Sequence, residues 1–512
     1  MNNPAASNRM TETPNQTEPS EGGLNWEIFF PVVLALVVGA MAITSQSFWM
    51  DECSTAILAV QPTFAAWRHS LMLDAGANNQ MPIYMFHVWV WQKLFDNSEL
   101  ALRASNLSWL ALGFLAIPRR QALFLFTLAT SSFLWYYLNE FRPYVALISS
   151  ALLMLGAVWH LVEMPEKPEN KTQELIWVGC FCLGMVLLSG VSLIGVIWTA
   201  AGVGAATAVL GRERGRQLLW RHLPIFMGTA APMLLLAIYY VVSLENGHRA
   251  VSGSTGLGNA VFIMYELTGF TGLGPGRLEI RAGGAAAFLP FIAPLLVYAT
   301  VLACILFAGG KYILQNFPRR VWLGVTAAFG AAAVFLLLVG VVTDFRVLGR
   351  HFSPLLLGVL LVIYSGLRDW EQRGGWRRLM VALFLLLSLT SALSARFGER
   401  HAKDDNRAAA TVARTAFAGK KNVWWCTDGG SGYWYGLPLV PAKTNTVAPG
   451  RIWWVADPPP EWLTNAAPPD LLILCKPELF DRSGETRAFL ERNHYHLTQK
   501  FQAFTLWQPQ SK

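Results

Sequence analysis

Charged residues are scarce in this sequence. Only 14% of its 512 residues are Asp, Glu, Lys or Arg, whereas a soluble globular chain carries roughly 25%. Cysteine is also scarce, with six in the whole chain, which excludes a fold held together by a dense disulfide framework. Apolar residues make up 54% and the mean hydropathy is +0.37. These values exclude a disordered, collagen-like or ordinary soluble protein and indicate a polytopic membrane protein.

Long apolar runs are abundant, and we interpret eleven of them as membrane-spanning helices. They are residues 28–47, 100–118, 121–138, 143–161, 175–189, 190–210, 223–243, 286–308, 321–342, 353–367 and 378–394. Because one span takes about 20 residues, more than half of the chain is left for loops, tails and an extramembrane domain. Residues 1–24 are polar and lack the pattern of a signal peptide, so we predict a disordered cytoplasmic tail, followed by a transmembrane catalytic domain over residues 25–395.

The positions of Lys and Arg predict the orientation of the chain. One set of connections is rich in these residues and is therefore assigned to the cytoplasm: Arg119, Arg120, Lys167, Lys171, Arg212, Arg214, Arg216, Arg221, Lys311, Arg319, Arg320, Arg368, Arg373, Arg377 and Arg378. The N-terminus is then cytoplasmic, and everything after the last span lies outside. The net charge of +8 thus reflects topology, and we predict no nucleic-acid partner.

Three large segments fall on the predicted outer side. Residues 48–99 contain aromatic-rich stretches that predict amphipathic helices at the membrane surface. Residues 244–285 are rich in glycine and predict a long mobile loop. Residues 396–512 contain short apolar runs near 422–426, 452–455 and 471–475, which are typical of buried parallel strands. They also contain predicted helices, from Asp404-Asp405 to Gly419 and over 483–493, and a terminal hairpin.

The third segment therefore predicts an extracytoplasmic α/β domain. Cys426 and Cys475 each end one of its predicted strands, so a disulfide bond between them is left open.

Polar clusters at the outer ends of the spans are the candidates for chemistry. Asp51 and Glu52 directly follow the first span, either as a hydrated helix end or N-cap, or as a carboxylate kept for base catalysis or metal binding. Glu140 and Arg142 lie at the turn after the third span, either as a local ion pair or as a second acid with an anion-binding cation.

A further cluster contains Arg346, Arg350 and His351, in the turn after the ninth span. Guanidinium groups are planar donors that suit phosphate, although contact with lipid headgroups is an alternative reading. A base together with guanidinium groups on one face of the membrane is what glycosyl or phosphoryl transfer at that surface requires.

This combination resembles the GT-C superfamily of integral-membrane glycosyltransferases, in the bacterial branch with protein O-mannosyltransferases and the lipid A aminoarabinose transferase. Residues 49–52 are similar to its first acidic motif, and residues 79–84 with 87–89 to its His-Pro-Pro-Leu-Tyr helix. Similar pieces follow in family order at residues 98–103, 140–144 (Glu-Phe-Arg-Pro-Tyr), 350–354 and 403–409. The sequence departs from the family at Gln80-Met81 and at residues 189–191.

The resemblance implies a reaction on the outer face of the bacterial inner membrane. The donor would be a polyprenyl-phosphate-linked sugar and the acceptor a lipid, glycan or protein, with membrane lipids around both. Asp51 would be the general base and the transfer would invert configuration. The remaining implied site residues are Glu52 and Glu140 (acceptor orientation or a divalent metal ion), Arg142, Arg346 and Arg350 (donor phosphate), and Tyr84, His87, Tyr144 and His351 (support).

A multipass transporter or flippase is the alternative from another class. Such a protein would place ionisable groups near mid-membrane and show related halves. Here the predicted spans are nearly free of charge, and no internal repeat is visible. The sugar, the acceptor, the metal requirement and the role of the C-terminal domain are not predicted by the sequence.

Overall fold

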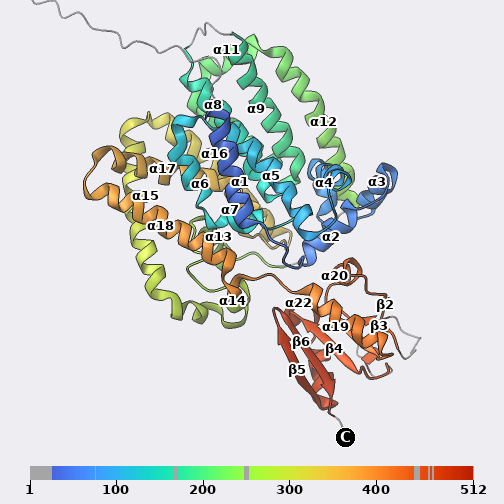
Figure 1. The fold of residues 1–512 in the computed structure, drawn as a ribbon. Helices are drawn as coiled ribbons and strands as arrows, with labels where there is room; N and C mark the ends of the chain where they lie inside the picture. Colours follow the sequence, from blue (N-terminus) through green and yellow to red (C-terminus); the bar gives the residue numbers. More distant parts are fainter. Residues whose placement is uncertain are drawn as a thin grey trace, which may run out of the picture.

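The computed structural model describes residues 26–74, 76–165, 171–246, 253–442, 450–458, 462–463 and 466–510. The predicted tail, residues 1–24, lies outside this described part. Figure 1 shows a large helical bundle with a small sheet domain at one end, next to the connection between α1 and α2.

The bundle comprises α1 (Trp26–Ala42), α2 (Met50–Ala59), α3 (Phe64–Leu73), η1 (Asn78–Gln80), α4 (Pro82–Leu94), α5 (Glu99–Leu115), η2 (Arg119–Gln121), α6 (Ala122–Ala129), α7 (Ser132–Leu138), α8 (Tyr144–Glu163), α9 (Lys171–Val191), α10 (Leu193–Leu210), α11 (Arg212–Arg221), α12 (Leu223–Asn246), α13 (Leu257–Leu267), α14 (Arg277–Gly283), η3 (Gly284–Phe291), α15 (Ile292–Asn316), α16 (Arg319–Val342), η4 (Gly349–Phe352), α17 (Leu355–Arg373), α18 (Trp376–Phe397) and η5 (Glu399–His401).

All eleven predicted apolar runs are helical over most of their length. Within the described residues, seven helical stretches are long and apolar enough to cross a membrane by length and composition. They are Tyr144–Glu163, Lys171–Val191, Leu193–Leu210, Leu223–Glu245, Arg277–Asn316, Arg319–Val342 and Trp376–Phe397. The predicted polytopic α-helical fold is thus confirmed, while the count of eleven spans stays a prediction.

Two breaks between helices have clear local causes: one falls inside the predicted run 121–138, and the other, at Ser192, lies just after the predicted split at residues 189–190. The run 121–138 is divided into α6 and α7, where the Ser131 hydroxyl accepts a hydrogen bond from the backbone N–H of Leu134 and begins the second helix. The turn between α9 and α10 is so tight that a Cβ on Gly195 would lie 1.8 Å from the carbonyl oxygen of Leu188. Only glycine fits there, because any side chain would collide with backbone.

The segment 244–285 differs from the predicted mobile loop. Residues 244–246 form the end of α12, and residues 253–285, the rest of its described part, contain α13 and α14 and pack against the bundle. The backbone N–H of Gly272 donates to the hydroxyl of Ser391 on α18 at 3.1 Å, and a Cβ on Gly272 would lie 1.7 Å from the carbonyl oxygen of Ser391. The glycines that indicated mobility include this close-packing position, so the prediction of an irregular loop is wrong for residues 253–285.

The C-terminal domain is a six-stranded sheet with helices on both faces (Figure 1). The strands are β1 (Val423–Cys426), β2 (Leu439–Pro441), β3 (Ile452–Trp454), β4 (Leu471–Cys475), β5 (Tyr495–Phe501) and β6 (Phe504–Pro509), and the helices are α19 (Asn406–Ala418), α20 (Gly429–Trp434), α22 (Pro477–Phe480) and α23 (Glu485–Arg492). The order is β2-β3-β1-β4-β6-β5. The first four strands are parallel to one another, β6 is antiparallel to β4, and β5 is antiparallel to β6.

This arrangement confirms the predicted α/β domain, its buried strands and its terminal hairpin. Asp405 begins α19 by accepting a hydrogen bond from the backbone N–H of Ala408, as the sequence predicted. Cys426 and Cys475 are both free thiols. They lie on adjacent strands, but Cys426 is opposite Leu474. Because side chains alternate across a sheet, this offset of one residue directs the two thiols to opposite faces.

Candidate active site

The site forms where the chain passes from α1 into α2. Residues 43–49 are non-helical, and α2 then begins with Asp51 and Glu52 in its first turn. Acidic residues are favoured there by the unpaired N–H groups and the helix dipole. Glu52 also accepts a hydrogen bond from the backbone N–H of Trp49 at 3.3 Å. The first turn of α2 therefore fixes both carboxylates relative to the helix axis.

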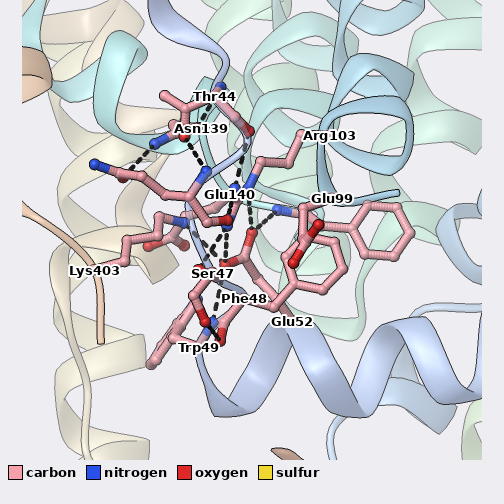
Figure 2. Close-up of polar contacts among 12 residues, drawn as sticks. Thr44, Ser47, Phe48, Trp49, Glu52, Glu99, Arg103, Asn139, Glu140 and Lys403 are labelled. Atoms are coloured by element: carbon pink, nitrogen blue, oxygen red, sulfur yellow. Dashed lines mark hydrogen bonds and ion pairs between the residues drawn. The ribbon is translucent and has the colours of Figure 1, made fainter. Parts of the chain in front are cut away.

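Glu52 is the centre of a fully buried network (Figure 2). Arg103 of α5 donates two hydrogen bonds of 2.8 Å to its carboxylate, from Nε to Oε1 and from Nη2 to Oε2. The backbone N–H of Phe141 donates to Oε1 at 2.7 Å, and Nζ of Lys403 lies 3.1 Å from Oε2. Burial raises the pKa of Glu52, but the charges of Arg103 and Lys403 outweigh this and bring it down to about 2.

The Glu52 network joins separate parts of the chain at one point. It connects the start of α2 to α5, to the turn after α7 and to the segment that leads into the C-terminal domain. Arg103 further donates to the backbone carbonyls of Thr44, Gln46 and Ser47. Glu52 thus acts as a structural hub, a different environment from the predicted acceptor or metal contact.

Asp51 points to a different and more open environment. Its Oδ2 lies 3.2 Å from Nη1 of Arg350, which precedes α17. The Asp51 side chain is 21% exposed, in contrast to 0% for Glu52. The guanidinium of Arg350 lies over the rings of Trp49 and Tyr144, at 5.5 and 5.8 Å from their centroids. Nε of Arg350 is buried and has no hydrogen-bond partner within the described chain.

Arg142 lies on the other side of Asp51. Its Nη1 donates to the hydroxyl of Thr55 at 2.6 Å, to Oδ1 of Asn78 at 2.8 Å and to the backbone carbonyl of Asp51 at 3.4 Å. All of these acceptors are uncharged, so the positive charge of Arg142 is not neutralised by direct contact. Its buried Nε has no partner in the described part of the chain, and the local ion pair with Glu140 that the sequence left open is not formed there.

Glu140 is buried, and its Oε2 has no hydrogen-bond partner among the described residues. Burial raises the pKa of Glu140, and the nearby cations Lys403 and Arg277 partly oppose that rise. The turn that carries Glu140 is held by Asn106, whose side-chain amide donates to the backbone carbonyls of Leu138 and Glu140 at 3.1 and 2.7 Å. A rigid turn therefore presents a carboxylate oxygen with spare acceptor capacity.

Tyr84 and Tyr144 lie within this site. Tyr84 is buried against Phe141, with a ring separation of 6.3 Å, and its hydroxyl is unpartnered in the described structure. His351 is adjacent in sequence to Arg350 and accepts a hydrogen bond at Nδ1 from the backbone N–H of Leu348 at 3.1 Å, which stabilises the turn.

His87 and Arg346 lie outside the site. His87 contacts α5, where its Nδ1 accepts from the indole N–H of Trp109 at 3.1 Å. Arg346 lines a separate cleft of about 460 Å³ together with Ser254, Glu478 and Arg482.

A second ion pair that the sequence did not single out borders the site. Glu266 of α13 pairs with Arg277 of α14 at 2.5 Å, and the guanidinium also donates to the hydroxyls of Tyr136 and Tyr137. Arg103 was likewise read only as part of a motif. One signal was available for it, because an arginine inside an apolar helix requires a buried acid or carbonyl partners.

A divalent metal ion, which the sequence left open, does not fit the donors around Glu52. Among the described residues, no three or more His, Cys, Asp or Glu side chains gather as a metal-binding group. Both oxygens of Glu52 accept hydrogen bonds from protein donors, two of them from a guanidinium. A divalent cation at Glu52 would have to displace these donors and would lie beside Arg103.

The fold and site together define a multipass membrane protein in which an acidic first turn, two arginine-bearing turns and an α/β domain meet at one end of the bundle. Neither a known family model nor a curated protein matches the sequence. The structure is similar to the crystal structure of ArnT from Cupriavidus metallidurans bound to undecaprenyl phosphate, at 14% identity and a TM-score of 0.51. The match covers 94% of this chain and 97% of that chain. The chain therefore shares the fold of that protein, and the resemblance of the sequence implied the same fold.

Proposed function

We propose that this protein is a glycosyltransferase that moves a sugar from a polyprenyl-phosphate donor to a hydroxyl group of a lipid, glycan or protein. The GT-C fold supports the class of reaction, and the undecaprenyl phosphate bound to the structurally similar ArnT supports the class of donor. The positive-inside pattern of the sequence supports an outer-face reaction at the bacterial inner membrane, with a cytoplasmic N-terminus and a periplasmic C-terminal domain.

The pair formed by Asp51 and Arg350 is the observation that carries this proposal. It combines a partly exposed carboxylate with a guanidinium at 3.2 Å. Arg350 bonds Asp51 through Nη1, while its buried Nε has no partner among the described residues. The same guanidinium can thus retain Asp51 and still donate to a phosphate oxygen. A base for the acceptor and a cation for the leaving group are both required for sugar transfer.

In the proposed reaction, Asp51 accepts the proton of the acceptor hydroxyl as that oxygen attacks the anomeric carbon. The bond between the anomeric carbon and the phosphate oxygen breaks, and its electron pair stays on the lipid phosphate. Arg350 and Arg142 stabilise the charge that develops there. Attack from the face opposite the leaving group inverts the anomeric configuration.

The other residues of the site support this step. Glu52 orients the first turn of α2 and thereby Asp51, because its network fixes the neighbouring residue. The free Oε2 of Glu140 is placed to accept a hydrogen bond from a substrate hydroxyl. Arg346 belongs to the neighbouring cleft, so we assign the donor phosphate to Arg350 and Arg142 in preference to Arg346.

The proposal is tested with the purified full chain in lipid nanodiscs. The probes are undecaprenyl phosphate esters of radiolabelled mannose and of radiolabelled arabinose, offered with a membrane extract as the source of acceptor. We expect release of free undecaprenyl phosphate and label on an acceptor with inverted configuration, and both should be about 10²–10⁴-fold slower with the D51N variant. A transporter would move the labelled donor across a bilayer unchanged. If both the mannose donor and the arabinose donor remain unaltered, the proposed transfer is refuted.

A further inference from the structure

The C-terminal domain holds the chain segment that leads into α2. The side-chain amide of Asn406 donates to the backbone carbonyl of Phe48 at 2.9 Å, and the backbone N–H of Arg407 donates to the hydroxyl of Ser47 at 2.9 Å. The hydroxyl of Tyr435 accepts from the backbone N–H of Phe48 at 2.7 Å. These contacts end only three residues before Asp51, so the domain shapes the approach to the proposed base.

Lys403 enters the site just before α19. Its side chain is 5% exposed, and its Nζ lies 3.1 Å from Oε2 of Glu52. Figure 2 shows Lys403 and Arg103 on opposite sides of the view, with Glu140 labelled between them. The charged and titratable groups around Lys403 are Glu52 of α2, Arg103 of α5, Tyr136 of α7, Glu140 of the following turn, Arg396 of α18 and His401 of η5.

Glu52 does not need Lys403 in order to be paired. Without Lys403, Glu52 keeps both bonds from Arg103 and those from the backbone N–H groups of Phe141 and Trp49. Burial lowers the pKa of Lys403 to about 8, although Glu52 opposes this, so the charged form is held in an unfavourable environment. Since Arg103 already supplies Glu52 with a charged partner, the geometry leaves Lys403 as an additional cation at this point of the site.

Glu140 lies next to this network, because the backbone N–H of the following residue, Phe141, donates to Oε1 of Glu52, the carboxylate that Lys403 contacts. Lys403 is the cation that contributes most to keeping the pKa of Glu140 down against burial. Only an ionised Glu140 offers Oε2 as an acceptor on both lone pairs, since a protonated carboxyl group is partly a donor. Without the ammonium, two buried carboxylates would lie close together, and one of them would tend to take up a proton.

We infer that Lys403 is a positioning residue through which the C-terminal domain completes the proposed active site. Its ammonium keeps Glu140 available as a carboxylate acceptor for a substrate hydroxyl, while Asn406 and Tyr435 hold the segment that carries Asp51. This inference rests on the proposed function for the identity of the substrate, but the electrostatic link between Lys403 and Glu140 does not.

The test compares K403M, K403R and the exposed control K421M in the full chain. With the undecaprenyl phosphate sugars, we expect kcat of K403M to fall at least tenfold, while KM for the donor changes less than threefold. The rate of the parent protein should fall as the pH rises through about 8, because Lys403 then loses its proton. K403R should stay active to higher pH, because arginine remains charged.

A measurement without substrate separates this inference from the proposed function. Infrared difference spectra at pH 7 should show the carbonyl band of a protonated buried carboxyl group in K403M. That band should be absent from the parent and from K403M/E140Q. The inference is overturned if K403M keeps the parental kcat, or if the rate of K403R falls with rising pH in the same way as the rate of the parent. It is also overturned if the carbonyl band is absent from K403M. If no protein transfers sugar but the band appears, the proposed function fails and the link between Lys403 and Glu140 stands.

Discussion

Replacing Glu52 by Gln removes the centre of the buried network while keeping its shape. Arg103 would then lie fully buried without a charged partner, with the glutamine amide oxygen and the backbone carbonyls of residues 44, 46 and 47 left as neutral acceptors. Breaking a buried pair in this way typically costs about 3–5 kcal/mol. We therefore expect E52Q to be among the most destabilising conservative substitutions in the chain.

The pKa of Glu52 gives a second value for the free energy that the buried pair contributes to stability. A decrease from 4.5 to about 2 corresponds to about 3 kcal/mol, at 1.36 kcal/mol for each unit. Because the pKa is lower in the folded protein, this stabilisation is complete above pH 4.5 and is lost as the pH falls towards 2. The parent protein should thus lose stability over that window, and E52Q should lose less.

The assay is thermal melting of the purified protein in detergent at a fixed scan rate. For a chain of this size we expect E52Q to melt about 3–5 °C lower at pH 7. The double variant E52Q/R103M should recover part of the loss, because the orphaned charge is gone. The matched control is E213Q, in an exposed pair with Arg216, which should melt within about 1 °C of the parent. An E52Q variant that melts at the parental temperature would refute the role of Glu52 as a structural hub. So would an E52Q variant that loses as much stability as the parent between pH 4.5 and pH 2.

Further predictions follow from the same site. D51N should lower kcat by about 10²–10⁴-fold in the sugar-transfer assay and leave the melting temperature unchanged, because Asp51 is partly exposed; an active D51N would exclude it as the base. R350K should raise KM for the donor at least tenfold, because lysine lacks the planar fork that bonds Asp51 and a phosphate together, and a parental KM would contradict this. G272A should melt several degrees lower, because its Cβ meets the backbone of α18, whereas G256A, which faces open space, should not.

The sequence predicted much of the fold because most of its signals are local. Apolar runs, an N-cap at Asp405 and short β-rich stretches each depend on a few adjacent residues. The helices of residues 253–285 were missed because the glycines around them indicate flexibility in isolation. Their packing against α18 becomes visible only when Gly272 and Ser391, 119 positions apart, are brought together.

The candidate site divides in the same way. Asp51, Arg142 and Arg350 were predicted to share one face of the membrane, and in the structure each arginine contacts Asp51, Arg142 at its backbone carbonyl and Arg350 at its carboxylate. The partner of Glu52 was not predicted, because Arg103 is 51 positions away on another helix. Whether a carboxylate becomes a hub or an open acceptor depends on such distant partners, so Asp51 and Glu52 could not be distinguished by sequence.

The hydrogen bonds between the C-terminal domain and the segment before α2 have an evolutionary consequence. A domain tethered by a loose linker can be exchanged between relatives by recombination without harm to the rest. Here Asn406, Arg407 and Tyr435 match the backbone of residues 47 and 48. Chimaeras that join this bundle to a foreign domain should fold but lose sugar transfer, unless the foreign domain has the same residues at these three positions. The bundle and the domain are therefore expected to be inherited as one unit, with breakpoints selected against near residues 398–405.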